Sequence, residues 1–157
     1  MHILYSVFVM SRKRRRGSPE LSILEEADAV EELLLECCKH INQQHNACWR
    51  ETFFQKSLIF ELQQRGYEVS SEVAYPVFYQ STIGKKTSVG NIFVDILTPT
   101  FCVETKMVKT LNLNHREQAR LYSSILRLPV YLVNAHSEHV EKHVNYCNTE
   151  KSLEIKL

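Results

Sequence analysis

Two carboxylates and a lysine lie in neighbouring apolar segments, where their types and spacing could do chemistry. Asp95 lies in the run 94–97, and Glu104 and Lys106 lie in the run 101–108. Charged groups in half-buried strands are costly unless they pair with one another or bind a cation. We therefore expect either a divalent-metal site for phosphodiester hydrolysis or a cross-strand salt bridge. Such a salt bridge on a solvated sheet face would contribute only about 0–1 kcal/mol.

Phosphodiester hydrolysis needs an in-line water, neutralisation of the charge developing on the phosphate, and help for the leaving alkoxide. Mg²⁺ prefers oxygen ligands, which Asp95 and Glu104 supply, and the carbonyl of Thr105 is a further candidate. Bound Mg²⁺, or Mn²⁺ in its place, would lower the pKa of a water and polarise the phosphate. Lys106 could orient that water and stabilise the developing negative charge.

The two apolar runs are typical of strands, joined by a tight turn over residues 98–100. Side chains alternate along a strand, so Cys102, Glu104 and Lys106 should share one face. If the two strands form a hairpin, Asp95 lies beside Glu104. The local pattern alone therefore predicts that the carboxylates meet.

The other elements follow from hydrophobic periodicity. Acidic residues and an apolar stripe predict a helix over residues 20–36, and Gly66 is a suitable stop for a second helix over 49–65. A strand is expected over 67–79, with Pro76 favouring an edge position or a bend. The remaining expected elements are a turn over 81–88, the two strands above, a helix over 114–126, a strand over 129–134 and a final helix over 137–147.

Five motifs then occur in the order and spacing of one known family. They are Cys48-Trp49-Arg50-Glu51-Thr52-Phe53-Phe54, the spacing Ser57-Leu58, Glu61-Leu62 and Gly66, the E-x-K motif Glu104-Thr105-Lys106, Gln118-Ala119-Arg120-Leu121-Tyr122, and Leu132-Val133-Asn134. In these motifs, over about residues 25–135, the chain resembles the GxxExxY family of the PD-(D/E)XK nuclease superfamily. It departs from the family signature where Cys48 replaces a glycine and Phe54 replaces a tyrosine.

The resemblance implies an α/β fold with a restriction-endonuclease-like core, in which helices flank a mixed central sheet. One such domain is expected over residues 20–157, after a disordered basic tail over residues 1–19. The implied activity is hydrolysis of nucleic acid, DNA in preference to RNA, with Mg²⁺ or Mn²⁺. The implied catalytic residues are Asp95, Glu104, Lys106, Glu51 and Gln118, and the metal ligands among them are Asp95, Glu104 and Glu51.

Basic residues cluster in the chain next to the expected site. Between residues 105 and 128 the only acid is Glu117. Lysine and arginine bind phosphates without regard to base sequence. The candidates for contact with nucleic acid are Lys106, Lys109, Arg116, Arg120, Tyr122 and Arg127, to which Lys85 and Lys86 could add. An ordinary solvated face is the alternative for each basic residue.

A separate basic cluster comprises Arg12, Lys13, Arg14, Arg15 and Arg16. Without these five, 19 − 5 = 14 basic residues stand against 18 acidic ones, so the folded body is mildly acidic despite a net charge of +1. The cluster is a candidate nuclear-localisation or polyanion-binding signal, or else a solvated tail. We expect an intracellular protein, in the nucleus of a eukaryotic cell or encoded by a virus that infects one.

Other functions receive less support. The five cysteines form no disulfide framework, which favours free thiols, and no segment suits a membrane span. Zinc at residues 37–48 or 136–147 lacks the paired short spacings of zinc sites. Two alternatives to a nuclease stay open: a catalytically silent nucleic-acid-binding or structural protein on the same fold, and an interaction module that uses the acidic first helix. A homodimer is also expected.

Overall fold

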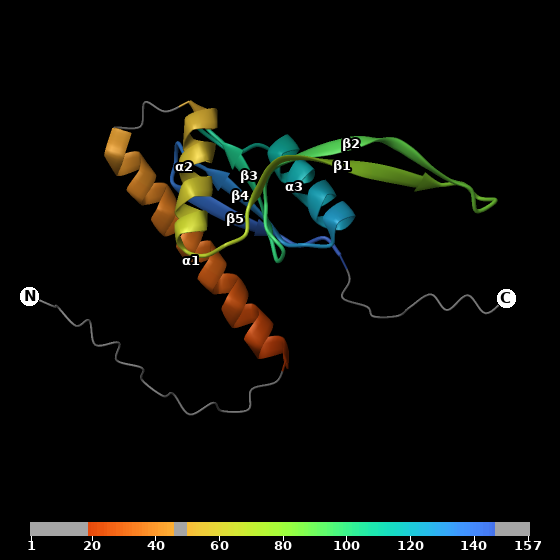
Figure 1. Ribbon diagram of the computed structural model, residues 1–157, viewed down its shortest axis with the longest axis horizontal. Coiled ribbons are helices and arrows are strands. Elements are labelled where there is room, and N and C mark those ends of the chain that lie inside the picture. Colours follow the sequence, from red (N-terminus) through yellow and green to blue (C-terminus); the bar gives the residue numbers. More distant parts are fainter. Residues whose placement is uncertain (1–18, 46–49, 147–157) are drawn as a thin grey trace, which may run out of the picture.

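A computed structural model describes residues 19–45 and 50–146 of the chain. Its elements, in chain order, are α1 (Pro19–His45), α2 (Glu51–Gln64), β1 (Ser70–Gln80), β2 (Lys86–Leu97), β3 (Cys102–Lys106), α3 (Leu113–Leu126), β4 (Val130–Asn134) and β5 (His139–His143) (Figure 1). The basic cluster of residues 12–16 lies outside the described residues, as does Cys48, so both predictions about them remain predictions.

The five strands form one sheet in the order β1-β2-β3-β4-β5. All neighbouring pairs are antiparallel except β3 and β4, which are parallel. Parallel neighbours need a crossover connection, and α3 provides it. The predicted mixed sheet with flanking helices is therefore confirmed.

Two hydrophobic cores lie on opposite faces of this sheet, and β4 shows how. Tyr131 and Val133 belong to the core under α1 and α2, whereas Val130 and Leu132 belong to the core under α3. Alternation along a strand explains the division, because successive side chains point to opposite faces. The result is three layers, with α1 and α2 on one side of the sheet and α3 on the other (Figure 1).

The predicted hairpin of the two site strands is confirmed. Ile96 pairs with Val103 in the antiparallel register of β2 and β3. In the turn, the Thr98 hydroxyl accepts a hydrogen bond from Phe101 N at 3.0 Å and donates one to Phe101 O at 2.8 Å. Continuing this register by one residue places Asp95 opposite Glu104, as the sequence predicted.

The helix boundaries are partly as expected. Gly66, with φ +85°, follows α2 in a left-handed conformation that glycine adopts without strain. The Gly66 and Tyr67 amides donate to the carbonyls of Gln63 and Leu62, which closes the helix in a Schellman motif. α1 continues to His45 instead of ending near residue 36, because its buried stripe also continues.

The expected final helix over residues 137–147 is wrong. Residues 139–143 instead form β5, which pairs antiparallel with β4 from Val130↔His143 to Asn134↔His139. This pairing satisfies the backbone groups on the outer edge of β4, which a helix would leave unpaired. Val140 packs into the core, and the polar neighbours alternate with it.

Strands β1 and β2 extend beyond the helical layers as a two-stranded ribbon (Figure 1). We call this ribbon, residues 73–94 with its turn, the arm. Pro76 lies on β1, which is the sheet edge that the sequence predicted for it. Among the described residues, no helix combines the length and apolarity needed to cross a membrane.

Candidate active site

Glu104 is the centre of the site. Its side chain lies on β3 and the residue is only 3% exposed. Oε1 accepts hydrogen bonds from Lys106 Nζ at 2.6 Å and from Gln118 Nε2 at 2.8 Å. Oε2 is buried and has no hydrogen-bond partner among the described residues. Burial, reinforced by the charge of Asp95, raises the pKa of Glu104 to about 7.

Lys106 neutralises part of the negative charge of Glu104. Burial opposes its positive charge, but the hydrogen bond to Glu104 and the carboxylates of Asp95 and Glu51 outweigh the burial and raise its pKa. Lys106 therefore stays protonated near neutral pH. The half-buried Lys106 ammonium, held against the buried Glu104 carboxylate, is a cation already in place for a negatively charged group.

Asp95 is held from two sides. Its Oδ2 accepts hydrogen bonds from the Thr105 amide and the Thr105 hydroxyl, both at 2.8 Å. Its backbone carbonyl accepts a hydrogen bond from Gln55 Nε2 at 3.1 Å, and that glutamine is buried in α2. The hydroxyl of Thr105 and the amide of Gln55 are supports that sequence reasoning missed, although Thr105 is the middle residue of the E-x-K motif.

Glu51 is exposed and opens α2, where the partial positive charge of the helix terminus favours a carboxylate. Its Oε2 accepts a hydrogen bond from the Met107 amide at 3.0 Å. This contact ties the start of α2 to the residue after Lys106. Glu51 therefore lies near the site, as predicted, while its role as a metal ligand remains a prediction.

Gln118 and Tyr122 lie one turn apart on α3. Gln118 Nε2 donates to Glu104 Oε1 and also to Tyr122 Oη, at 3.0 Å. The Tyr122 ring is buried in the core under α3. In this structure Gln118 therefore touches the predicted catalytic carboxylate directly, and Tyr122 supports Gln118 from within the core.

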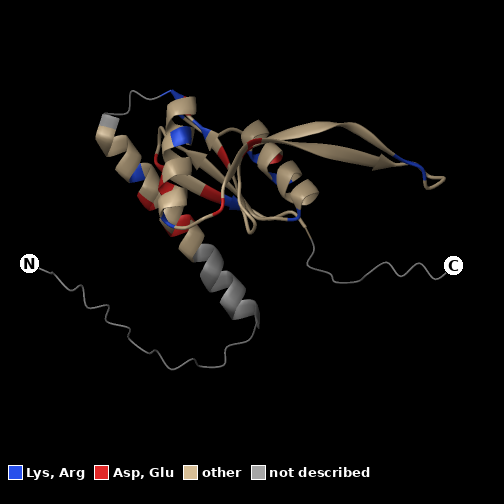
Figure 2. Ribbon diagram, in the orientation of Figure 1, with Lys and Arg blue, Asp and Glu red and all other residues tan. Residues whose placement is uncertain are grey.

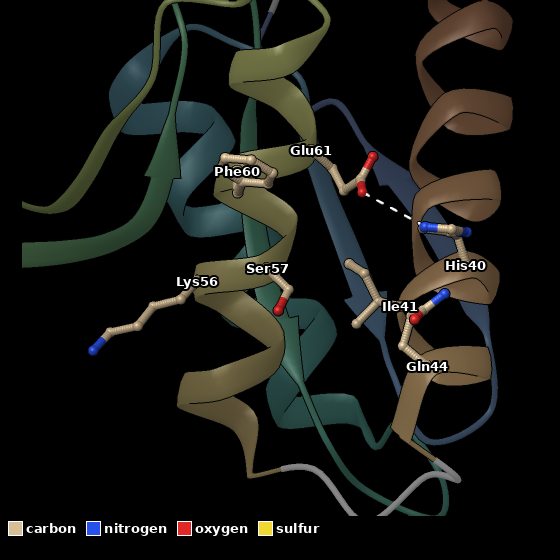
Figure 3. Close-up of a pocket in the computed structure, with 7 residues that line it drawn as sticks. All are labelled: His40, Ile41, Gln44, Lys56, Ser57, Phe60 and Glu61. Atoms are coloured by element: carbon tan, nitrogen blue, oxygen red, sulfur yellow. Dashed lines mark ion pairs between the residues drawn. The ribbon is translucent and has the colours of Figure 1, made fainter.

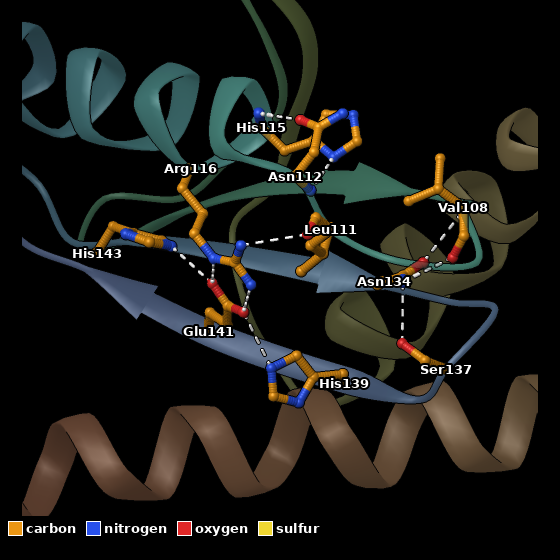
Figure 4. A network of polar contacts seen from close by, with 10 residues as sticks. All are labelled: Val108, Leu111, Asn112, His115, Arg116, Asn134, Ser137, His139, Glu141 and His143. Carbon is orange, nitrogen blue, oxygen red and sulfur yellow. Dashed lines mark hydrogen bonds and ion pairs between the residues drawn. The ribbon is translucent and has the colours of Figure 1, made fainter.

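The predicted basic contacts are engaged within the protein to different degrees. Arg116 forms two hydrogen bonds with Glu141, at 2.8 and 2.7 Å (Figure 4). This pairing lowers the pKa of Glu141 to about 2. Arg120 pairs with Glu117 at 2.6 Å one turn away. Lys109 and Arg127 are exposed.

The loop after β3 is fixed by Asn134, which is 1% exposed. Its amide group accepts from Val108 N at 3.1 Å and donates to Val108 O at 2.8 Å and to Ser137 Oγ at 2.9 Å (Figure 4). The chain therefore leaves Lys106 in a defined direction. The motif Leu132-Val133-Asn134 pointed to this residue without indicating the bonds.

The carboxylates suit a divalent cation of the Mg²⁺ type. Glu104 Oε2 is a buried oxygen without a hydrogen-bond partner among the described residues, and Asp95 lies on the adjoining strand. Mg²⁺ commonly takes one or two protein carboxylates and keeps several waters. Within the part of the chain that the structure describes, no three His, Cys, Asp or Glu side chains converge as metal ligands. A site of two carboxylates fits this structure, whereas Glu51 does not converge with them.

The predicted site residues do not line the shallow cavity of about 320 Å³ between α1 and α2 (Figure 3). Its lining includes His40, Phe60 and Glu61, and His40 Nε2 lies 3.9 Å from Glu61 Oε1. Cys37 and Cys38 are free thiols buried in the core, where the described residues offer no zinc site. His139 and His143 turn to Glu141 instead (Figure 4).

Comparison with known proteins agrees with the architecture. No match was found among curated proteins or solved structures. The family model described as the PD-(D/E)XK nuclease superfamily matches residues 28–147, a span that contains the whole sheet and all of the candidate site residues above. The chain belongs to the PD-(D/E)XK nuclease superfamily.

Proposed function

We propose that the protein is a metal-dependent nuclease that hydrolyses phosphodiester bonds in DNA. One observation carries the proposal: Glu104 is buried beside Asp95, its Oε1 is bonded to Lys106 and Gln118, and its Oε2 has no partner among the described residues. A salt bridge made only for stability would not leave a buried carboxylate oxygen unpaired, because that costs roughly 1–3 kcal/mol or more.

Asp95 and Glu104 would hold Mg²⁺ or Mn²⁺, which supplies Lewis-acid polarisation of the phosphate and a more acidic water when bound. The protein's own groups then do the rest. Lys106 places a positive charge where the phosphate becomes more negative. Gln118 orients the Glu104 carboxylate and offers an amide for a water or a phosphate oxygen, while Tyr122 keeps Gln118 in place.

Further features belong to the same proposal. Glu51, at the start of α2, would hold a water or a second ion apart from the two-carboxylate site. The place of Glu51 before the E-x-K strand supports membership of the GxxExxY family. The exposed residues Lys109 and Arg127, together with Arg116 and Arg120 when released from their acidic partners, bind the phosphate backbone. Two copies of the protein cut the two strands, and the cluster of residues 12–16 directs the protein to the nucleus.

The decisive experiment is a nuclease assay with Mg²⁺ and with Mn²⁺ on single-stranded DNA, duplex DNA, branched DNA and RNA. Wild type is compared with Lys106→Ala and Asp95→Asn, and Lys39→Ala on the exposed surface of α1 serves as a matched lysine control. We expect wild type and Lys39→Ala to cut DNA, with EDTA abolishing cleavage. The two site variants should lose at least about a hundredfold, the order typical for one electrostatic group in a site.

A catalytically silent nucleic-acid-binding protein on the same fold is the second candidate. It is favoured by the internal engagement of the carboxylates: Asp95 Oδ2 is bonded to Thr105 and Glu51 Oε2 to Met107. Absence of metal-dependent cleavage on every substrate, combined with DNA binding in a gel-shift assay, would favour this candidate over the nuclease.

A further inference from the structure

The arm has an unusual charge pattern. Between Glu72 and Asp95 its only charged residues are Lys85 and Lys86, at the turn and at the start of β2. Figure 2 shows this basic tip and the otherwise uncharged ribbon behind it. In a protein body whose acids outnumber its bases, a projecting segment with cations and no anion is complementary to a polyanion.

The arm also carries much of the exposed apolar surface. Eleven large hydrophobic residues are exposed among the described residues, and six of them lie in the arm, with exposed fractions between 39% and 78%. They are Tyr75, Phe78, Tyr79, Ile83, Val89 and Phe93. Clustered exposed apolar side chains mark binding sites more often than scattered ones do. Four of the six are aromatic, which favours a partner whose groups stack on aromatic rings.

Both faces of the ribbon present these rings. Phe93 pairs across from Ala74, and Phe78 lies four residues further along β1, so both rings share one face. The Lys86 ammonium lies 4.5 Å from the Phe78 ring centroid on that face. By the same alternation, Tyr75 and Tyr79 occupy the opposite face. A ring beside a cation is a unit that can hold a base and its phosphate together.

The arm is directly connected to the candidate active site, because β2 contains both Lys86 and Asp95. The two residues are nine positions apart on the strand, so at about 3.3 Å per residue the separation is up to roughly 30 Å. That reach is comparable to one turn of duplex DNA, about 34 Å. A segment held on the arm would thus be anchored about one helical turn away from the place where a phosphate meets Lys106.

We propose that the arm is a stacking platform for unpaired bases, which binds a single-stranded segment of the substrate through its exposed aromatic rings and the lysines at its tip. Stacking requires accessible base faces, which single strands offer and an intact duplex does not. The identity of the substrate rests on the proposed nuclease function, whereas the test measures binding alone.

The test measures fluorescence anisotropy of labelled single-stranded DNA and of the matching duplex, in EDTA so that no cleavage occurs. Phe78→Ala and Tyr79→Ala remove one ring from each face, far along the arm from Asp95. Phe60→Ala on α2 is the matched control, because Phe60 is 59% exposed and Phe78 is 52% exposed. We expect each arm variant to weaken single-strand binding about five- to tenfold, as loss of one base–aromatic stack should. Duplex binding and Phe60→Ala should change less than twofold, and Phe78→Tyr should retain binding.

Unchanged single-strand affinity in both arm variants would overturn the proposal. A second result would also overturn it: arm variants that bind DNA normally but no longer self-associate in light scattering. The arm would then bind a second copy of the chain. Circular dichroism verifies that each variant is folded. The two proposals fail separately, because arm-dependent binding of single-stranded DNA by the wild-type protein without any cleavage refutes only the nuclease. Cleavage with arm-independent binding refutes only the platform.

Discussion

The pH dependence of stability offers a direct test of the buried carboxylate. Glu104 has a pKa of about 7 in the folded protein, against an ordinary value of 4.5. Because the folded pKa is raised, the contribution of Glu104 to stability is fully present below pH 4.5 and is lost as the pH rises through 7. The difference of about 2.5 corresponds to roughly 3 kcal/mol, at about 1.36 kcal/mol for each pKa unit.

Glu104→Gln removes this titration and keeps the shape of the side chain. Near pH 4 the neutral glutamic acid and the glutamine should behave alike toward Lys106 and Gln118. As the pH rises to 8, wild type should lose roughly 3 kcal/mol relative to the variant, with roughly 2 kcal/mol of that already lost by pH 6. Comparing the two proteins across pH cancels the titration of groups that both share.

The assay is urea unfolding of both proteins at pH 4, 6 and 8 in EDTA, followed by circular dichroism. Glu117→Gln is the control, since Glu117 is exposed on α3 and the stability difference should stay nearly constant. A stability difference between wild type and Glu104→Gln that varies by less than about 0.5 kcal/mol over this range would refute the desolvation of Glu104, because even a pKa raised by about 0.5 would exceed it. Adding Mg²⁺ at pH 8 should stabilise wild type and not the variant, through preferential binding to the folded state.

Other predictions test the surroundings of the site. Arg116→Met should destabilise the protein at neutral pH, and the loss should shrink as urea unfolding is repeated at pH values falling toward 2, since Glu141 has a lowered pKa; a pH-independent loss would contradict this. Asn134→Ala should cost about 2–3 kcal/mol in urea unfolding because it leaves the Val108 amide and carbonyl without their partner, and a change under 0.5 kcal/mol would be a refutation. Gln118→Leu should raise the pKa of Glu104 in a carbon-13 NMR titration because the carboxylate loses a donor; an unchanged pKa would count against the contact.

The hairpin of β2 and β3 illustrates what could be predicted locally. Turn chemistry and strand alternation act over a few residues, so the pattern around residues 94–108 was enough to bring Asp95 beside Glu104. The family resemblance added Gln118, which the sequence places 14 residues away and which the structure bonds to Glu104. Periodicity failed at β5, because a segment of five residues is too short to separate a strand from a helix.

The basic stretch shows the opposite case. With Glu117 as the only acid between residues 105 and 128, the sequence presents Arg116 as a cation available for phosphate. In the fold, Arg116 meets Glu141 from β5, 25 residues later in the chain. Such a pairing depends on how α3 packs across the sheet, and no local pattern encodes it. The same holds for the hydroxyl of Thr105 at Asp95, which requires the antiparallel register to be in place.

The sequence by itself determined the fold class and the identity of the chemical groups, because both depend on residue type, alternation and short spacings. Only the tertiary structure decided their electrostatic state. Burial of Glu104 between the sheet and α3, with one oxygen paired and the other without a partner in residues 19–45 and 50–146, arises from contacts among segments distant in the chain. Desolvation is a property of the packed molecule, so the raised pKa of Glu104 could not be read from its neighbours in sequence.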